Sequence, residues 1–309
     1  MLADQCPRSR ISHEIMRHRG VTPIEYLGGR WNKHWVVESG GSRLVLRGYS
    51  PDPWDDIDYE LEVLRRLRGL GWPVPVAVEE PVHVGGRTWC LFTWLPGICR
   101  PSADSSEERR ARGRLLAELH GSTARIAKMG QRGGFGRSDE MIRDPELVSL
   151  IRSYERIHPA EGHIMRWHLD RAHEAFERID VETAETIVLH SDFTRWNLLF
   201  EGDSLTGILD FEATHLNYRV ADFALSWRGQ YDEVIEGYQE VQKLTDLDWE
   251  LLVPVYWSWI FLGVRKEIKA MLSGKVLPHG FEWQVNHLKK RSGLLGRQAP
   301  QYPGHNSGS

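Results

Sequence analysis

Residues 185–212 constrain the fold of this chain more than any other stretch, because they set a row of polar residues among short apolar strands. ETIVLH indicates a strand, HSDFTRWN follows it as a loop, and LLF-EGDS-LTGILDF indicates a hairpin. The polar spacing is His190-x-Asp192-x4-Asn197, and Asp210 comes after the hairpin. The hairpin therefore brings Asn197 and Asp210 together, and Asp192 lies on the loop that precedes them.

This set of oxygen-bearing side chains suits phosphoryl transfer from ATP. The reaction needs a carboxylate that orients the attacking hydroxyl, and oxygen ligands that hold magnesium against the phosphates. Asp192 suits the first role, and Asn197 and Asp210 suit the second, because Mg²⁺ prefers hard oxygen donors. The competing interpretation is that they are turn and cap residues, positions that Asp and Asn favour. The strand before the loop and the hairpin after it favour the catalytic interpretation.

Length and composition bound the class of protein. A chain of 309 residues has room for one large domain or two small ones. The net charge of −4 argues against general nucleic-acid binding. Three cysteines without metal-type spacing favour a reducing, cytoplasmic setting. Neither an apolar run of membrane-spanning length nor a signal-peptide core is present in the sequence, so we expect no membrane partner.

The predicted secondary structure changes near Leu95–Gly97 from mostly strands to mostly helices. Residues 22–49 predict three strands, with breaks at Gly28–Gly29 and Gly40–Gly41, and further strands are expected around residues 76–78 and 88–94. A helix is expected to begin at a cap formed by Asp52, Asp55 or Asp56 and to end near Leu70. Further helices are expected over residues 107–127, 145–157, 163–179 and much of 222–295, and a loop at 129–138. We therefore predict lobes of residues 1–96, of which 1–23 could be an extension, and 97–297, followed by a disordered tail at 298–309.

The first long helix predicts a buried carboxylate. At about 100° per residue, one apolar arc contains Ile57, Leu61, Leu64 and Leu67. Glu60 falls inside this arc, whereas Glu62 points away from it and is expected to be solvated. An unpaired buried charge is costly, so Glu60 needs a basic partner.

In their order along the chain, these motifs resemble the aminoglycoside phosphotransferase and choline kinase family, which has the protein-kinase-like fold. The matching pieces span residues 24 to 230: Gly28-Gly29-Arg-Trp-Asn32, LVLR, YELEVLRRL followed by PVP, FTWLPG, LLAELHG, HSDFTRWN, ILDFE and RVADFALSW. The resemblance implies an α+β fold with a small antiparallel-sheet N-terminal lobe and a larger, mainly helical C-terminal lobe. It also implies that ATP and Mg²⁺ bind between the lobes.

The resemblance assigns roles on the nucleotide side. Gly28 and Gly29 would cover the phosphates, although a plain β-turn explains them as well. Arg47 stands where the family's phosphate-contacting strand residue pairs with a helix glutamate, here Glu60. Many protein kinases have Lys at this position, so the way in which Arg47 would contact the phosphates stays open. The alternative interpretation is that Arg47 is an ordinary surface residue of the strand.

Further roles follow from the same resemblance. The backbone around Thr93 and Leu95 would form the hinge that bonds adenine, unless this segment is simply a strand end. His190 and Asp222 would support the catalytic loop, with a simple helix cap as the alternative for Asp222. His120 is expected to be a hydrogen-bonded core residue.

The acceptor is expected to be a hydroxyl of a small molecule. Only nine residues separate Glu212 from Asp222, too few for the activation segment of a protein kinase. Glu212, Thr214, His215 and Trp257 are candidate acceptor-site residues. Aminoglycosides or other antibiotics, choline-like cations, homoserine and sugars all stay open as acceptors.

The sequence therefore predicts an ATP- and Mg²⁺-dependent small-molecule kinase in which Asp192 activates the acceptor hydroxyl. Two alternatives remain: a catalytically weak kinase-like binding or regulatory protein, suggested by Arg47, and a metal-dependent phosphoesterase. A cytoplasmic monomer or homodimer is expected.

Overall fold

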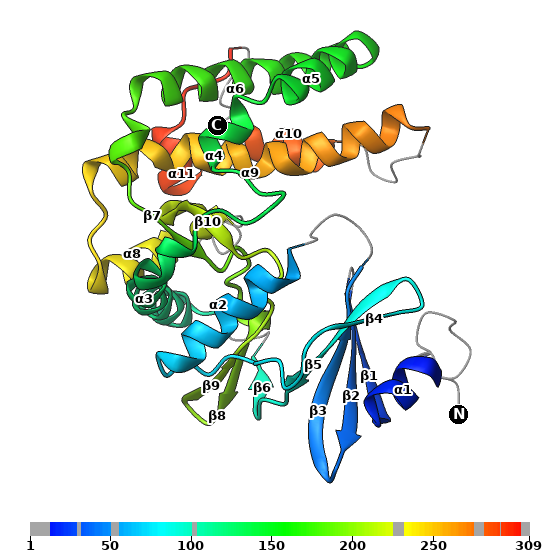
Figure 1. The fold of residues 1–309 in the computed structure, drawn as a ribbon. Helices are drawn as coiled ribbons and strands as arrows, with labels where there is room; N and C mark the ends of the chain where they lie inside the picture. Colours follow the sequence, from blue (N-terminus) through cyan, green and yellow to red (C-terminus); the bar gives the residue numbers. More distant parts are fainter. Residues whose placement is uncertain are drawn as a thin grey trace. The chain divides into compact units, whose positions relative to one another are not determined.

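The computed structural model describes residues 13–29, 32–50, 56–100, 104–224, 232–274, 281–290 and 292–303. The chain forms two compact units (Figure 1). Unit 1 comprises Met1–Pro101 and Trp196–Ala213, and unit 2 comprises Ser102–Arg195 and Thr214–Ser309. The division at Pro101 lies close to the predicted change at Leu95–Gly97, but residues 196–213 group with the sheet-containing unit.

Unit 1 contains, in the residues described, an antiparallel five-stranded sheet in the order β1-β2-β3-β5-β4 (Figure 1). Its strands are β1 (Thr22–Gly28), β2 (Lys33–Ser39), β3 (Ser42–Gly48), β4 (Val82–Val84) and β5 (Arg87–Thr93). The β2–β3 hairpin turns at Gly40 and Gly41, whose φ angles of 56° and 79° belong to a type I′ turn. The strand expected at residues 76–78 is only an isolated bridge between Ala77 and Phe92, and β4 was not predicted.

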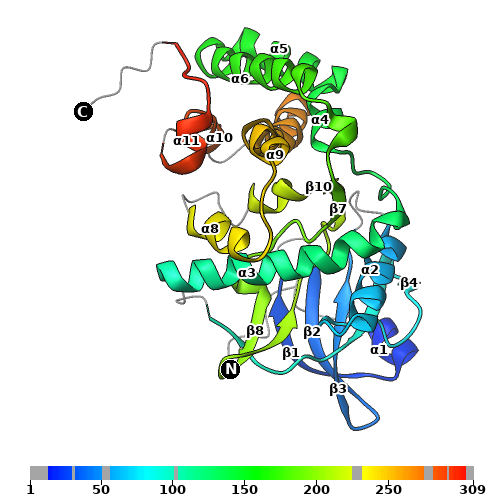
Figure 2. The same ribbon diagram turned by 90° about the vertical axis from the view of Figure 1, so that its left-hand side faces the viewer.

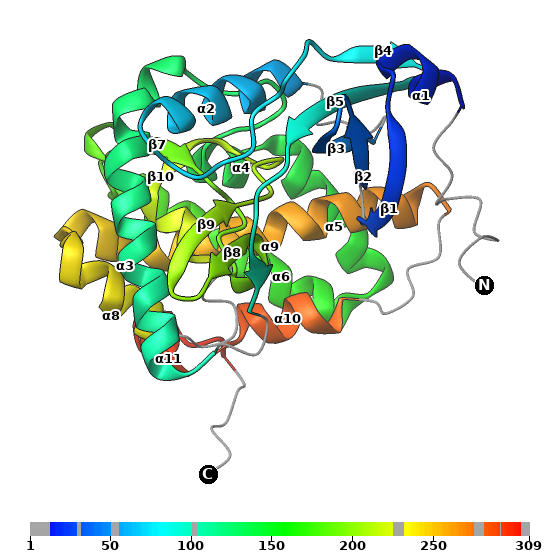
Figure 3. The same cartoon turned by 90° about the horizontal axis from the view of Figure 1, so that it is seen from below.

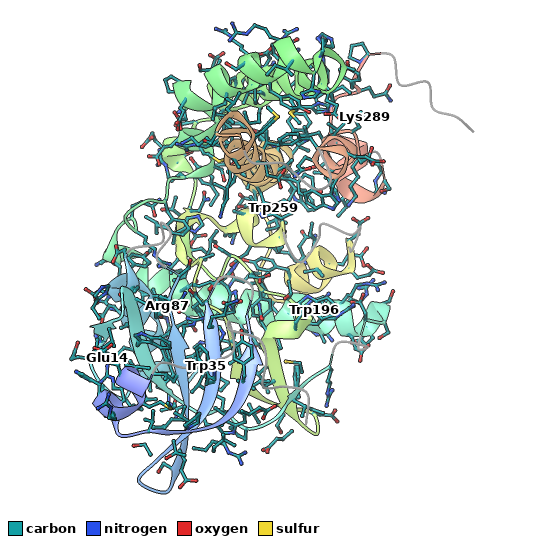
Figure 4. All side chains as sticks on the ribbon, turned by 90° about the vertical axis from the view of Figure 1, so that its right-hand side faces the viewer. Glu14, Trp35, Arg87, Trp196, Trp259 and Lys289 are labelled. Atoms are coloured by element: carbon teal, nitrogen blue, oxygen red, sulfur yellow. The ribbon has the colours of Figure 1, made fainter. Side chains whose placement is uncertain are left out.

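The two faces of this sheet have different partners. One face packs with α1 (His13–Arg19) in an apolar cluster that includes Ile15, Trp35, Leu46 and Trp89; Trp35 is labelled in Figure 4. Because side chains alternate along a strand, Arg47 points to the opposite face. There it meets α2 (Ile57–Gly69), which Asp56 caps by accepting a hydrogen bond from the Tyr59 N–H at 3.1 Å.

A second small sheet completes unit 1. Its order is β6 (Ile98–Cys99), β8 (Leu198–Glu201) and β9 (Ser204–Ile208), as Figure 3 shows. Strands β8 and β9 form the predicted hairpin, preceded by the short helix η4 (Arg195–Asn197).

Unit 2 is mainly helical. Its helices are α3 (Ser106–Thr123), α4 (Ser138–Ile142), α5 (Pro145–Ile157), α6 (Pro159–Arg178), α8 (Asp232–Val241), α9 (Asp246–Leu272), α10 (Glu282–Leu288) and α11 (Gly293–Gln298), with 3₁₀ turns η2 (Ala124–Met129), η3 (Val181–Thr183) and η5 (Arg219–Asp222). The strands β7 (Thr186–Leu189) and β10 (His215–Tyr218) pair antiparallel. The bounds of α5 agree with the prediction, whereas α6 begins earlier because Pro159 occupies its first turn. Among the described residues, no helix is both long and apolar enough to span a bilayer.

Helix α9 forms the centre of unit 2. Helices α4, α5, α6 and α10 all pack against it, and Figure 2 shows α5 and α6 beside it. Most side chains from Leu251 to Phe261 are buried. The helix therefore supplies core rather than surface along this stretch.

Helices α3 and α8 lie side by side in unit 2 (Figure 2) and approach each other through glycines. A Cβ atom on Gly113 of α3 would lie 2.0 Å from the Val234 carbonyl oxygen, and one on Gly237 of α8 would lie 2.1 Å from the Arg110 carbonyl oxygen. Both obstacles are backbone atoms, which cannot move aside as a flexible side chain can. The close packing of these helices thus depends on the two glycines.

We predict that Gly113→Ala lowers the free energy of unfolding by about 1–3 kcal/mol, because the added methyl group overpacks the α3–α8 contact. Gly263→Ala is the matched control, since a Cβ at this position of α9 would meet nothing within 4 Å. The control should gain about 0.5–1 kcal/mol from its better helix propensity. Urea unfolding of both variants measures whether the free energy of unfolding falls in Gly113→Ala and rises in Gly263→Ala. Equal stability of Gly113→Ala and the original chain would contradict the glycine contact.

Candidate functional site

In unit 1, the β8–β9 hairpin brings Asn197 and Asp210 close together. Leu198 pairs with Ile208, and the Leu209 N–H donates to the Asn197 carbonyl oxygen at 2.8 Å. Asp210 follows with φ = 68° and a side chain that is 34% exposed. The two oxygen-bearing side chains therefore leave the same end of the hairpin.

Arg47 is almost fully buried and has a partner on each side-chain nitrogen. Nη1 donates to Glu60 Oε1 at 2.5 Å, Nη2 donates to Asp210 Oδ1 at 3.3 Å, and Nε donates to His34 Nε2 at 2.8 Å. Burial alone would lower the pKa of Arg47, but Glu60 and further neighbouring groups raise it well above its usual value. Arg47 is therefore a fixed cation beside the hairpin residue Asp210.

Glu60 lies where the helix periodicity predicts, with its side chain 1% exposed and paired with Arg47. Its second oxygen accepts a hydrogen bond from the Tyr49 hydroxyl at 3.2 Å. Glu62 lies on the outer side of α2, 32% exposed and paired with Arg65 and Arg66. The predicted difference between the two carboxylates is confirmed.

Gly28 and Gly29 both have positive φ angles, 92° and 124°. A Cβ on Gly29 would lie 1.9 Å from the Asn32 carbonyl oxygen, whereas one on Gly28 would meet nothing within 4 Å. Gly29 is therefore required by close packing as well as by backbone conformation. The phosphate-covering role of the pair stays a prediction.

Glu212 lies just after the β8–β9 hairpin in unit 1, close to Asp210. It accepts a hydrogen bond from the Asn32 side-chain amide, and Asn32 Oδ1 in turn accepts one from the Ser50 N–H at 2.8 Å. Burial and the neighbouring Asp210 raise the pKa of Glu212 to about 7. These contacts connect Asn32, which follows the glycine pair, to the end of the hairpin. The place of Glu212 in the acceptor site stays a prediction.

Thr93 and Leu95 lie at and just after the end of β5. The Thr93 N–H donates to the Val76 carbonyl at 3.0 Å, and Thr93 Oγ1 accepts from the Val76 N–H at 3.1 Å. Leu95 is half-buried. Their assignment to an adenine-binding hinge stays a prediction.

In unit 2, one buried carboxylate holds the loop that carries Asp192. Asp222 accepts hydrogen bonds from the backbone N–H groups of His190 at 2.9 Å and Ser191 at 2.5 Å. Ser191 has a φ of 69°, an uncommon conformation for a side-chain-bearing residue. The Asp192 N–H then donates to His190 Nδ1 at 3.1 Å. These hydrogen bonds join Asp222 and His190 to the loop. Their role in supporting a catalytic loop stays a prediction.

His120 also contacts this carboxylate, at the oxygen that accepts from the His190 N–H. It is 2% exposed, and its Nε2 lies 2.9 Å from Asp222 Oδ2 while its Nδ1 lies 3.0 Å from the Tyr238 hydroxyl. Burial alone would raise the pKa of Asp222, but its hydrogen bond with His120 and the neighbouring histidines lower it. The prediction that His120 is a hydrogen-bonded core residue is confirmed.

Two of the candidate acceptor-site residues are inaccessible in the structure. Thr214 is 0% exposed and donates to the Leu189 carbonyl at 2.5 Å. Trp257 is 1% exposed and packs edge-on against His168, with ring centroids 5.0 Å apart. Both side chains belong to the core. The prediction that they line the acceptor site is therefore wrong.

His215 remains a candidate acceptor-site residue. Its Nδ1 lies 3.2 Å from the Ser191 hydroxyl, and its Nε2 lies 3.2 Å from the Asn217 side-chain amide. Its ring stacks on Phe135 with centroids 4.7 Å apart. The residue is therefore next to the loop that carries Asp192 within unit 2, and Phe135 is a neighbour that the sequence patterns did not single out.

The oxygen-bearing side chains at the end of the hairpin suit magnesium. Nowhere in the described part of the chain do three His, Cys, Asp or Glu side chains gather into a metal-binding group. Mg²⁺ is commonly held by one or two carboxylates together with waters and substrate phosphates. Asn197 and Asp210, adjacent at the end of the hairpin, fit that pattern.

Comparisons with known proteins find relatives that match most of the chain. The model of the phosphotransferase enzyme family matches residues 22–250. A homoserine kinase from Zymomonas mobilis is 25% identical over 255 residues, 76% of this chain and 75% of its own length. A homoserine kinase from Azorhizobium caulinodans is 27% identical over 255 residues, 75% of this chain and 76% of its own length.

Solved structures share the fold. The aminoglycoside phosphotransferase APH(4)-Ia, in a ternary complex with AMP-PNP and hygromycin B, has a TM-score of 0.67 at 16% identity, covering 90% of this chain and 96% of its own. An amicoumacin kinase in complex with AMP-PNP, Ca²⁺ and its antibiotic has a TM-score of 0.65 at 12% identity, covering 96% of both chains. The predicted kinase-like fold is confirmed.

The raised pKa of Glu212 predicts how stability changes with pH when no metal is added. Because its pKa in the folded state is about 7, above the ordinary 4.5, the folded protein resists its ionisation. Stability contributed by the protonated form is then lost as pH rises from about 4.5 to 7, by at most about 1.4 kcal/mol per pH unit. Glu212→Gln should therefore melt at a higher temperature than the original chain at pH 8, with the gap closing near pH 4.5.

Glu62→Gln is the control, because Glu62 is an outward-facing carboxylate whose pKa its arginine partners lower to about 2. It should not raise the melting temperature at pH 8. Parallel pH–stability curves for Glu212→Gln and the original chain would contradict the burial of an ionisable Glu212.

Proposed function

Because this chain belongs to the phosphotransferase enzyme family, we propose that it transfers the γ-phosphoryl group of ATP to a hydroxyl group of a small molecule with the help of Mg²⁺. The observation that carries the proposal is the set of contacts of Arg47 in unit 1. This buried cation is held by Glu60 and reaches Asp210, which lies beside Asn197. A cation and oxygen ligands so arranged suit the phosphates and metal of a nucleotide.

Each residue of unit 1 has a separate task on the donor side. Arg47 binds phosphate oxygens, and Glu60 keeps its guanidinium in place. Asn197 and Asp210 supply oxygen ligands for Mg²⁺, which neutralises charge on the β- and γ-phosphates when bound. Gly28 and Gly29 allow the backbone to approach the phosphates, and the backbone at Thr93 and Leu95 binds adenine.

Asp192 is the proposed catalytic residue on the acceptor side. Its carboxylate orients the acceptor hydroxyl and takes its proton as the oxygen bonds to the γ-phosphorus. The bond from that phosphorus to the β–γ bridging oxygen breaks, and ADP leaves. His190 and Asp222 fix the loop so that Asp192 keeps its orientation.

The first acceptor to test is homoserine, because the curated relatives reported above are homoserine kinases. Aminoglycosides and amicoumacin are the next, since these classes are bound by the structural neighbours. His215, adjacent to Ser191, is the proposed acceptor-side residue. Neither a phosphoesterase nor a non-catalytic role gains support from the comparisons. We propose a cytoplasmic enzyme that acts as a monomer or homodimer.

Asp192→Asn should lower kcat by about 10²- to 10⁴-fold, because the general base is lost. Its affinity for Mg·ATP should stay within about twofold, since the substitution leaves the unit 1 residues intact. ADP release across a panel of homoserine, choline, sugars, aminoglycosides and macrolides measures the first effect, and calorimetric titration measures the second. Full turnover by Asp192→Asn would show that another group activates the hydroxyl.

Asp210→Asn should raise the Mg²⁺ concentration needed for half-maximal nucleotide binding by at least about tenfold. The reason is that a charged metal ligand is replaced by a neutral one. Asp203→Asn provides the control on the same hairpin, where the Asp203 side chain is fully exposed. Titrating Mg²⁺ at fixed nucleotide should separate the two variants. An unchanged metal requirement in Asp210→Asn would exclude the metal role.

A further inference from the structure

His34 lies opposite Arg47 in the sheet of unit 1. The β2–β3 register pairs the two residues directly, so their side chains leave the same face of neighbouring strands. This is the face on which Arg47 meets Glu60 of α2. None of the family motifs in the sequence includes His34, and the family comparisons leave the residue unassigned.

The two ring nitrogens of His34 have different partners. Nε2 accepts the hydrogen bond from Arg47 Nε at 2.8 Å. The other nitrogen faces the glycine pair: the ring hydrogen-bonds to the backbone of Gly28, and a Cβ on Gly29 would lie 3.1 Å from Nδ1. Since Arg47 can only donate, His34 carries its proton on Nδ1 and donates it to the Gly28 carbonyl.

The surroundings keep this imidazole neutral. Burial first, and then the Arg47 charge, lower its pKa to about 3. A protonated ring would offer no lone pair to Arg47, so the neutral form is the one that fits the observed contacts. His34 is therefore a hydrogen-bond acceptor for Arg47 throughout the neutral pH range.

This contact distinguishes arginine from lysine at position 47. An arginine carries an Nε–H in addition to its two Nη groups, so it can satisfy His34, Glu60 and Asp210 together in one planar fork. A lysine has a single ammonium group and no counterpart of Nε–H. Where protein kinases often have Lys, this chain has an Arg together with a histidine that fits it.

We propose that His34 is a positioning residue for the donor nucleotide, which sets the Arg47 guanidinium through Nε and connects it to the glycine pair through the Gly28 carbonyl. The proposal rests on the function proposed above, because it assumes that Arg47 contacts phosphates. With the guanidinium already oriented, less side-chain freedom is lost when the nucleotide binds. The cation and the glycine segment are thereby held in one arrangement.

A double-mutant cycle tests this coupling with Mg·AMP-PNP as the probe, so that no acceptor is needed. His34→Leu removes both hydrogen bonds and should weaken binding by about tenfold or more, the range for hydrogen bonds to charged groups. Arg47→Lys should weaken it comparably. The double variant should bind no worse than Arg47→Lys alone, because His34 acts through the arginine.

Two further substitutions separate positioning from a merely structural effect. In His34→Gln the side-chain oxygen can still accept from Arg47 Nε, so binding should recover to within about threefold of the original. His34→Asn is too short to reach and should behave like His34→Leu. His83→Leu on β4 is the control, since His83 is exposed in the same sheet, and its binding should be unchanged.

Additive losses in the cycle, or original affinity in both His34→Leu and His34→Asn, would overturn the proposal while leaving the kinase function intact. Failure of the original chain to bind Mg·AMP-PNP would instead overturn the proposed function, and this inference with it. If His34→Leu does not fold, as judged by circular dichroism, the Gln and Asn pair still decides the question.

Discussion

The buried ion pair between Arg47 and Glu60 is the interaction on which the proposed nucleotide site of unit 1 depends. Removing one partner of such a pair commonly costs about 3–5 kcal/mol, because the other charge is left buried. The pair joins strand β3 to helix α2, and Tyr49, His34 and Asp210 satisfy its remaining hydrogen-bonding groups. The cation that we propose to bind phosphate is therefore also part of the core of unit 1.

Unit 2 uses the same principle with a different set of groups. Asp222 is a buried carboxylate whose partners are two backbone N–H groups and His120 rather than an arginine. Its hydrogen bonds hold His190 and Ser191 in place ahead of Asp192. In both units a buried carboxylate thus orients neighbouring groups through hydrogen bonds.

The sequence allowed prediction of those parts of the fold and site that depend on local periodicity. The phase of α2 placed Glu60 inside and Glu62 outside, and the double glycine located the β2–β3 turn. Burial that depends on packing between segments far apart in the sequence could not be predicted in this way. Thr214 is polar and Trp257 is aromatic, as residues of a binding site often are, yet both lie in the core. The His34–Arg47 contact was equally hidden, because it depends on the strand register. Opposite positions across the Gly40–Gly41 turn were the signal that could have revealed it.

Ser191 and Asp210 are the non-glycine residues with positive φ in the described part of the chain, and each stands in one of the two segments to which the chemistry is assigned. A side chain in this conformation costs about 1 kcal/mol or more relative to glycine. Directed evolution for heat resistance alone would therefore favour glycine at both positions, and at position 210 it would remove the carboxylate that we propose as a metal ligand. A library sorted on thermal survival without a turnover screen would drift toward robust but inactive proteins.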